Sequence, residues 1–320
     1  MSVTVIRPAD RAAWLDARRQ DVTASVAAAV LNVHPYTSQY QLWAEKTGRL
    51  SPDGEATDAM MRGVYIEPVG VAMLRDQKPE WAVEYHADNA YYRDEKIRIG
   101  ATPDAFAVDP GREGRGNVQI KSASESAFKD YWIDPDTKQV IPPTWIALQA
   151  ITEARLTGCD WACVALVVIT WRGTLRLYVI DIPLIERHWV AIKTGVAEFW
   201  RVVDAGEHPP IDWEKDGSTV LDVYRDSYTD VRDLSDDAAL DVIIRRYKEA
   251  KELESSGKKL ADTLKPQIIF ALGNSAAGKT ASYDIRASTQ IRASYVASES
   301  QSRVLRIKPR RDHDVDASRF

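Results

Sequence analysis

The spacing of apolar residues changes along the chain, from helical spacing near the N-terminus to strict alternation in the middle. Helical spacing predicts helices over residues 9–20, 24–31, 38–46 and 55–77. From Trp81 the period shortens to two, which predicts six strands over residues 82–85, 97–100, 105–108, 117–122, 162–170 and 175–182. Helical spacing returns over residues 145–156 and 184–203.

The order of these elements predicts the fold class. Helices, then a run of strands with an inserted helix, then more helix, indicate an α/β or α+β domain with one mixed sheet flanked by helices. After Pro209 the chain becomes polar, residues 236–265 form a charged amphipathic pattern, and residues 281–307 alternate like a β-hairpin. We therefore expect a domain of residues 1–210 followed by an appended helical and hairpin module of residues 211–320.

Composition narrows the classes of protein that fit. The 320 residues include 42 Lys and Arg against 47 Asp and Glu, a net charge of -5. An acidic total does not exclude a local basic surface for nucleic acid. The two cysteines, Cys159 and Cys163, are not paired as in a zinc site, so we interpret them as core residues in a reducing compartment. With neither a signal-peptide pattern at the N-terminus nor an apolar run of about 20 residues, the sequence predicts a cytoplasmic protein without a membrane partner.

A short acidic turn and the strand after it carry the candidate chemistry. Asp104 ends the segment Ala-Thr-Pro-Asp, and Gln119, Ile120 and Lys121 follow on the next predicted strand. Alternation places Gln119 and Lys121 on one face and turns Ile120 into the core. An inward lysine needs a negative partner, and Asp104 with a bound metal and a phosphate would supply one. The alternatives are a turn cap at Asp104 and an edge strand whose Lys121 faces water.

Glu67 is the third candidate of this kind. It interrupts the apolar face of the predicted helix 55–77, where Val71 and Leu74 follow at helical spacing. A solvated helix position is the alternative interpretation. An aspartate, a second polar residue and a lysine in this order, with a nearby glutamate, are typical of a metal-dependent phosphodiesterase site, although the second residue is usually an acid and is Gln119 here.

Together these segments resemble the phage lambda-type recombination exonucleases, the alkaline exonucleases of the restriction-endonuclease-like class of nucleases. The resemblance covers roughly residues 10–200. The matching residues are Trp14, Arg18, Thr23-Ala24-Ser25, Trp43, Thr47-Gly48, Arg62-Gly63, Glu67-Pro68, Ala101-Thr102-Pro103-Asp104 and Gln119-Ile120-Lys121.

The resemblance implies an activity and an assembly. It implies a restriction-endonuclease-like core and a Mg²⁺-dependent 5′→3′ exonuclease, for which Mn²⁺ could substitute. The enzyme would degrade one strand of linear double-stranded DNA from its end and leave a 3′ overhang for recombination by strand annealing. A ring-shaped homotrimer, a single-strand annealing protein as partner, and an origin in a phage or prophage of a bacterial host are implied as well.

The resemblance also implies roles for the metal-site candidates. Asp104, Gln119 and the backbone carbonyl of Ile120 would ligate Mg²⁺. Glu67 would bind a second metal ion or a metal-bound water, and Lys121 would position the attacking water and help to deprotonate it. A glutamine carbonyl can ligate Mg²⁺ but brings no charge.

Four further residues are candidates for contacts with the DNA or the site. Arg18 and Ser25 occupy positions where the family holds the 5′-terminal phosphate. Ser25 lies at the start of a predicted helix, where free N–H groups favour an anion, although plain N-capping is the alternative. Gln149 is expected near the site or on a helix surface. Met60 is a candidate apolar wedge at the terminal base pair, or an ordinary helix packing residue.

Two other functions compete with the exonuclease. The segment Gly273–Thr280 fits the P-loop pattern of nucleoside triphosphatases, but a P-loop must open a helix, and residues 281–286 alternate like a strand. The second alternative is a DNA-end-binding or scaffold protein that is catalytically weakened by the neutral Gln119. We expect the exonuclease, because it alone uses all of the candidate residues.

Overall fold

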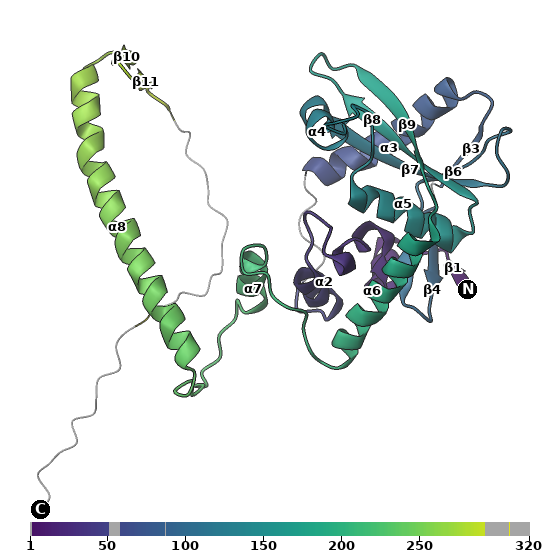
Figure 1. Cartoon of the computed structure of the whole chain (residues 1–320), viewed down its shortest axis with the longest axis horizontal. Coiled ribbons are helices and arrows are strands. Elements are labelled where there is room, and N and C mark those ends of the chain that lie inside the picture. Colours follow the sequence, from purple (N-terminus) through teal and green to yellow (C-terminus); the bar gives the residue numbers. More distant parts are fainter. Residues whose placement is uncertain (1, 51–57, 87, 292–306, 308–320) are drawn as a thin grey trace, which may run out of the picture. The chain divides into compact units, whose positions relative to one another are not determined.

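The computed structural model describes residues 2–50, 58–86, 88–291 and 307, without the side chains of residues 59 and 60. The chain divides into two units, Met1–Val223 and Tyr224–Phe320, which are described separately (Figure 1). Residues 211–223 belong to the first unit, because Ile211, Val220 and Val223 pack against its core. The division therefore falls later than the expected boundary at residue 210.

A five-stranded mixed sheet forms the centre of the first unit. Its strand order is β3-β6-β7-β8-β9, in which β7 and β8 are parallel and the other neighbours are antiparallel. The strands are β3 (Ala82–Tyr85), β6 (Ala105–Val108), β7 (Gly116–Ser124), β8 (Trp161–Ile169) and β9 (Leu175–Ile182). The prediction of a mixed sheet flanked by helices is confirmed.

A second, smaller sheet has the order β1-β4-β5-β2. Its strands are β1 (Val3–Ile6), β2 (Val22–Thr23), β4 (Tyr91–Asp94) and β5 (Ile99–Ala101). The sequence did not predict β1 and β4. Both strands lack the alternation of buried and exposed positions that a half-buried strand shows, because the two inner residues of each share one degree of burial.

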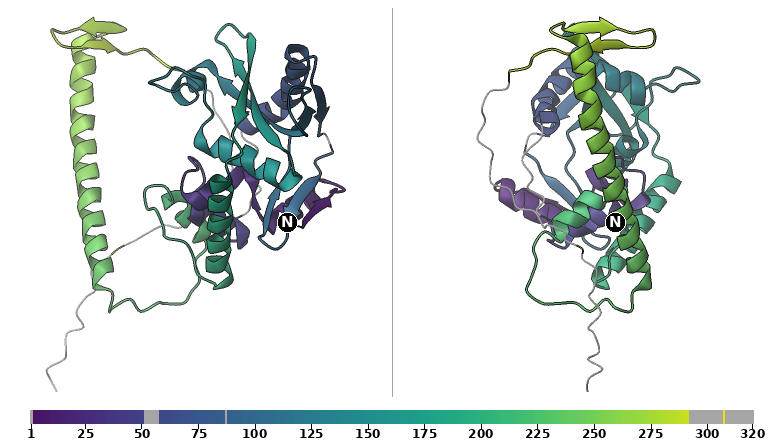
Figure 2. Two further views of the ribbon diagram at one scale, coloured as in Figure 1. Left: turned by 45° about the vertical axis from the view of Figure 1, so that its right-hand side comes forward. Right: turned by 90° about the vertical axis from the view of Figure 1, so that its left-hand side faces the viewer.

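Helices cover both faces of the central sheet (Figures 1 and 2). On one face, α3 (Asp58–Gln77) packs Val71 and Leu74 against Ile120 of β7. On the other face, α5 (Thr144–Thr157) packs against β7 and β8, and α6 (Glu186–Asp204) packs against α5. The contact of α3 is close: a Cβ at Gly70 would lie 2.6 Å from Cγ2 of Ile120.

One predicted helix is wrong. Residues 24–31 form two 3-10 turns, Ala24–Val26 and Ala29–Leu31, and the second ends at Asn32 in the left-handed region with φ 56°. The alanines of this segment are buried side by side, so it has no solvent-facing side of a helix. Its alanine content reflects the small space available in a tightly packed turn. The remaining helices of the first unit are α1 (Arg11–Arg19), α2 (Gln39–Lys46), α4 (Glu125–Tyr131) and α7 (Gly217–Val223).

The described residues of the second unit form one long helix and a short hairpin. Helix α8 (Ala238–Leu272) extends beyond the predicted end at residue 265, and none of its residues is buried. Strands β10 (Ala277–Lys279) and β11 (Asp284–Arg286) form the hairpin. This hairpin begins before the predicted one, and most of the predicted range 281–307 lies outside the described residues.

The hairpin also decides the P-loop question. Residues 273–280 form the turn after α8 and strand β10, and Lys279 pairs across the hairpin with Asp284 at 3.8 Å. The segment after Thr280 is a turn and a strand, so the helix N-terminus that would hold a nucleotide phosphate does not follow it. The P-loop interpretation is wrong.

Candidate active site

One cleft of about 720 Å³ in the first unit brings the predicted site residues together. It is lined by Arg18, Ser25, Glu67, Asp104, Gln119, Ile120, Lys121 and Gln149. Met60 lies in the first turn of α3, and its side chain is outside the described part of the chain. The residues of the cleft come from α1, the first 3-10 turn, α3, the loop before β6, β7 and α5.

Asp104 occupies the loop between β5 and β6 and is half-buried. Its Oδ2 accepts hydrogen bonds from the backbone N–H of Ile120 at 2.7 Å and from the side-chain amide of Gln119. The carboxylate therefore binds the neighbouring strand instead of capping its own turn. Burial raises the pKa of Asp104 well above its usual range, and the carboxylates of Glu153 and Glu67 add to this rise while Lys121 opposes it.

Lys121 lies on an inner strand, because β7 is paired with β6 on one side and with β8 on the other. The edge-strand alternative is therefore wrong. Ile120 packs under α3, while Gln119 and Lys121 line the cleft, as the alternation predicted. The half-buried ammonium of Lys121 lowers the pKa of the surrounding carboxyl groups.

Glu67 is half-buried on α3, one turn before Gly70, and lines the cleft instead of facing bulk water. Burial raises the pKa of Glu67, and a hydrogen bond with Tyr85 and the charge of Lys121 partly offset the rise. Burial and the neighbouring Glu67 raise the pKa of the Tyr85 hydroxyl to about 12. Sequence reasoning missed Tyr85, because its relation to Glu67 depends on how α3 crosses β3.

The side chain of Gln119 is 1% exposed and lies at the centre of a hydrogen-bond network. Its Nε2 donates to Asp104 and, at 3.4 Å, to the carbonyl oxygen of Ile120, and its Oε1 accepts from Nε2 of Gln149 at 3.0 Å. The amide N–H group thus points at the two oxygens that the resemblance assigns to the metal. Gln119 could ligate a metal through Oε1 only after its amide turned over.

The donor atoms around the cleft fit a hard divalent cation. Asp104 and Glu67 supply carboxylate oxygens and Ile120 supplies a carbonyl oxygen, the ligand types that suit Mg²⁺ and Mn²⁺. Among the described residues, no three His, Cys, Asp or Glu side chains are grouped closely enough to hold a metal ion by themselves. An ion in this cleft would therefore keep water among its ligands.

Glu153 on α5 is a buried acid that sequence reasoning missed. It is 1% exposed, and it accepts hydrogen bonds from Nε2 of Gln149 at 2.9 Å and from Nδ2 of Asn117 at 3.1 Å. Burial raises the pKa of Glu153 to about 7, against the opposing effects of Gln149, Lys121 and Asn117. The available signal was an acid one helical turn after Gln149 on an otherwise apolar helix.

Arg18 and Lys46 make part of the cleft cationic, and we call this part its basic end; Arg18 also lines a smaller pocket with Asp104 and Glu67. Nη2 of Arg18 lies 3.4 Å from Oγ of Ser25, and the guanidinium stacks 4.2 Å from the centre of the Trp14 ring. Ser25 lies in a three-residue 3-10 turn, so the expected helix start and N-cap are both wrong. The attraction for an anion at this end comes from side-chain charge.

Lys46, which sequence reasoning also missed, adds to that charge. Its Nζ donates to the backbone carbonyl of Arg18 at 2.8 Å. Burial and the neighbouring Arg18 lower the pKa of Lys46 to about 8. Two half-buried cations thus lie together at this end of the cleft, and an anion between them would relieve their repulsion.

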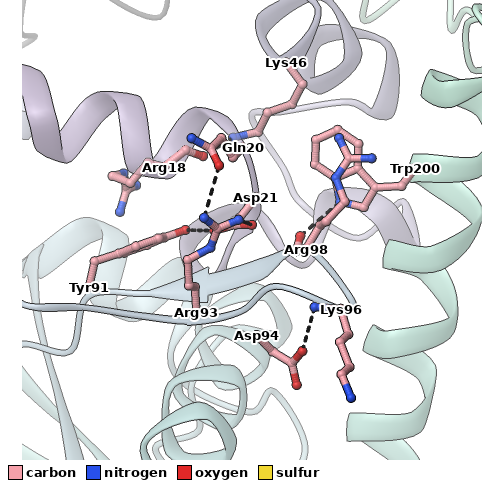
Figure 3. Close-up of polar contacts among 10 residues, drawn as sticks. All are labelled: Arg18, Gln20, Asp21, Lys46, Tyr91, Arg93, Asp94, Lys96, Arg98 and Trp200. Carbon is pink, nitrogen blue, oxygen red and sulfur yellow. Dashed lines mark hydrogen bonds and ion pairs between the residues drawn. The ribbon is translucent and has the colours of Figure 1, made fainter. Parts of the chain in front are cut away.

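A polar cluster holds this end of α1 in place (Figure 3). Asp21, just after α1, is fully buried and accepts from the hydroxyl of Tyr91 at 3.0 Å and from Nη2 of Arg93 at 2.9 Å. Arg93 also donates to Gln20 at 3.1 Å (Figure 3). These bonds tie the end of α1 to β4 and so fix the position of Arg18.

The mixed sheet and its covering helices thus bring an aspartate, a lysine and a helix-borne glutamate into one cleft. Residues 13–160 match the family model described as the YqaJ-like viral recombinase domain. Over this range the chain is similar to that domain, which bears out the resemblance to the lambda-type recombination exonucleases.

Two solved structures of an alkaline exonuclease are similar to the chain. The first, LHK-Exo from Laribacter hongkongensis, is 23% identical with a TM-score of 0.46, and the match covers 65% of this chain and 98% of that one. The second, LHK-Exo in complex with dAMP, is 20% identical with a TM-score of 0.43 and the same coverage. No curated protein matches. Within the described residues, no helix is long and apolar enough to cross a membrane.

Proposed function

We propose that this protein is a divalent-metal-dependent exonuclease that degrades one strand of linear double-stranded DNA from its 5′ end. The product would be a 3′ single-stranded overhang for recombination by strand annealing. The observation that supports this proposal is the single cleft, with Arg18 and Lys46 at one end and Asp104, Glu67 and Lys121 at the other. A terminal phosphate at the first end would bring a phosphodiester bond to the second.

Asp104, the carbonyl oxygen of Ile120 and Glu67 are the residues that would hold Mg²⁺, with Mn²⁺ as a substitute. When bound, the ion would polarise the phosphoryl oxygen and lower the pKa of a bound water. Glu67 could also hold a second ion or a metal-bound water. Gln119 joins this set only when its amide turns its oxygen away from Gln149.

Lys121 is the proposed positioning group for the nucleophile. Its ammonium lies among the carboxyl groups of the cleft, where it can donate a hydrogen bond that holds the attacking water. Only as the neutral amine would Lys121 also help to take up the proton of that water. The same charge would stabilise the negative charge that develops on the phosphorane-like transition state. The hydrogen bond from Ile120 to Asp104 fixes the acid in relation to this lysine.

Arg18 and Ser25, with Lys46 beside them, would bind the 5′-terminal phosphate. A guanidinium offers two parallel donors to a phosphate, and the stacking on Trp14 orients it. The hydroxyl of Ser25 lies within reach of the same anion. This contact would select DNA ends over internal sites.

The remaining proposals concern assembly. A homo-oligomer, a trimeric ring by family resemblance, would keep the enzyme on the DNA topologically. A single-strand annealing protein would receive the exposed strand, and the second unit, Tyr224–Phe320, is the proposed contact region. We place this activity in the cytoplasm of a bacterial host that carries the phage or prophage.

A catalytically weakened DNA-end-binding protein is the second candidate function. One observation favours it: Gln119 is neutral, and its oxygen is engaged by Gln149. This candidate predicts binding to DNA ends without nucleotide release in Mg²⁺.

Nucleotide release from 5′-phosphorylated linear duplex DNA, in Mg²⁺ and in EDTA, separates the two candidates. We expect release in Mg²⁺ that Lys121→Met lowers by at least about 100-fold. Lys129→Met on α4 is the matched control, because that lysine is exposed and pairs with Glu125 of the same helix, and it should leave the rate unchanged. Release by wild type in EDTA, or release by Lys121→Met at the wild-type rate in Mg²⁺, would contradict the proposed mechanism.

A further inference from the structure

The acid that is missing at position 119 has a counterpart elsewhere in the cleft. Glu153 and Asp104 both line a pocket of about 260 Å³ that Glu67 and Arg18 also line. Glu153 comes from α5, one helical turn after Gln149, and both side chains face the strand that carries Gln119. A fully buried carboxylate next to a cluster of acids is costly unless it has a function or a cation nearby.

A continuous hydrogen-bond chain links Glu153 to the proposed metal ligands. Gln149 donates from one nitrogen both to Glu153 at 2.9 Å and to Gln119 at 3.0 Å, and Gln119 donates onward to Asp104. A carboxylate can only accept, so an ionised Glu153 fixes the direction of every bond in this chain. Asn117, two residues before Gln119 on β7, donates the second bond to Glu153.

The charges around the cleft indicate what this chain of hydrogen bonds would do. Around the floor of the cleft, the carboxylates of Asp104 and Glu67 and the ammonium of Lys121 leave one net negative charge when Gln119 is neutral. Glu153 adds a second negative charge, which would favour a divalent cation, and the guanidinium of Arg18 in the same pocket offsets part of it. Its charge lies close to the proposed metal ligands, because Glu153, Asp104 and Glu67 line the same pocket.

We infer that Glu153 supplies the negative charge that Gln119 does not, and that Gln149 links this relocated acid to the proposed metal site. Glu153 is then a positioning residue that acts through its charge, without touching the substrate, and the amides of Gln149 and Gln119 hold it beside the proposed ligands. The inference rests on the proposed metal-dependent function and deepens it.

Equilibrium binding of Mn²⁺ in the absence of DNA tests the inference apart from catalysis. We expect Glu153→Gln, which keeps the shape of the side chain, to weaken Mn²⁺ binding by about tenfold or more at pH 8. Moving the acid back, in the double variant Gln119→Glu with Glu153→Gln, should restore the affinity to within about threefold of wild type. Thermal unfolding in EDTA checks that each variant is folded.

Two further variants separate charge from packing. Glu153→Asp keeps the charge and disturbs the bonds to Gln149 and Asn117, so Mn²⁺ affinity should stay within about threefold of wild type. Glu125→Gln on α4 is the matched control, because this acid lies outside the cleft and binds Lys129 and the backbone of Trp171, and it should change nothing.

The outcomes are distinguishable. If wild type binds Mn²⁺ and Glu153→Gln binds it equally well, the inference is wrong while the proposed metal site stands. Equal losses in Glu153→Gln and Glu153→Asp, or no rescue by Gln119→Glu, would show a packing role and would also overturn it. Failure of wild type to bind Mn²⁺ would overturn the metal site and the inference together.

Discussion

The two ends of the cleft satisfy their charged groups in opposite ways. At the acidic end, Asp104 accepts a hydrogen bond from Gln119, and Glu153 accepts one from Gln149. Gln149 also donates to Gln119, so the two acids are linked through their amide donors. At the basic end, Lys46 is held by a backbone carbonyl and Arg18 by an aromatic ring. The acids are thus fixed by hydrogen bonds in positions that suit a cation, whereas the basic end keeps positive charge available for an anion.

Removing the acidic end and leaving the basic end intact tests whether the two ends act independently. We expect Asp104→Asn to lower nucleotide release in Mg²⁺ by about 1,000-fold or more, because the proposed metal loses its main charged ligand. Binding to 5′-phosphorylated duplex should change by less than about threefold, since the basic end is untouched. Release kinetics and duplex binding by anisotropy measure the two effects.

Asp109→Asn is the control for that experiment. Asp109 follows the other end of β6 and pairs with Arg112, so its loss should alter neither release nor binding. A parallel loss of DNA binding in Asp104→Asn would show that the two ends are not independent.

The converse change removes the basic end. Arg18→Met should slow release from 5′-phosphorylated ends by about 10- to 100-fold, because the charge-assisted bonds to the phosphate are lost. Release from 5′-hydroxyl ends should change by no more than about threefold. The ratio of the two rates is the measured quantity, and the exposed Arg201→Met on α6 should preserve the wild-type ratio. An equal loss on both kinds of end would place Arg18 outside phosphate recognition.

The buried acids should also make the free energy of unfolding depend on pH. Burial raises the pKa of Glu153 to about 7, so the folded protein holds a proton that the unfolded chain has released above its ordinary pKa. Stability contributed by this protonated acid is present at low pH and is lost as pH rises toward 7, by up to about 3 kcal/mol in EDTA. Urea unfolding between pH 5 and 8 measures the loss.

Glu153→Gln should remove part of that pH dependence, and the share that remains comes from Asp104 and Glu67, whose pKa values burial also raises. An unchanged pH profile in this variant would mean that Glu153 titrates normally.

The smallest expected effect concerns how α3 brings Glu67 to β7. Gly70→Ala would place a Cβ 2.6 Å from Cγ2 of Ile120 and 3.3 Å from Cγ2 of Val167, so we expect a loss of about 1 to 3 kcal/mol in the free energy of unfolding. Gly63→Ala on the same helix meets no atom within 4 Å and should be neutral or stabilising. Equal effects in the two variants would contradict the close approach of α3 to the sheet.

Much of the acidic end could be predicted from sequence, because it depends on local periodicity. Alternation on β7 correctly separated Ile120 from Gln119 and Lys121, and the helix that carries Glu67 was recognisable from its apolar spacing. Glu153 and Tyr85 could not be found in this way, because their contacts depend on how α5 and α3 cross the strands. The sequence shows an acid in each element but not the distance between elements.

The basic end was less predictable for a related reason. Arg18 and Ser25 were identified by family resemblance, but the helix start expected at Ser25 is a 3-10 turn. Lys46 reaches Arg18 from α2 across a large separation in the chain, and only its backbone contact reveals it.

Helix α8 has a consequence for how the second unit can be observed. It spans 35 residues with no buried side chain and includes Gly257 and Pro266, so its backbone gains little protection from tertiary packing. Its amide protons should therefore exchange rapidly with solvent in the free protein. A partner that covered the helix would slow this exchange at the residues that it contacts. Hydrogen exchange along α8 would therefore report where and when a partner binds.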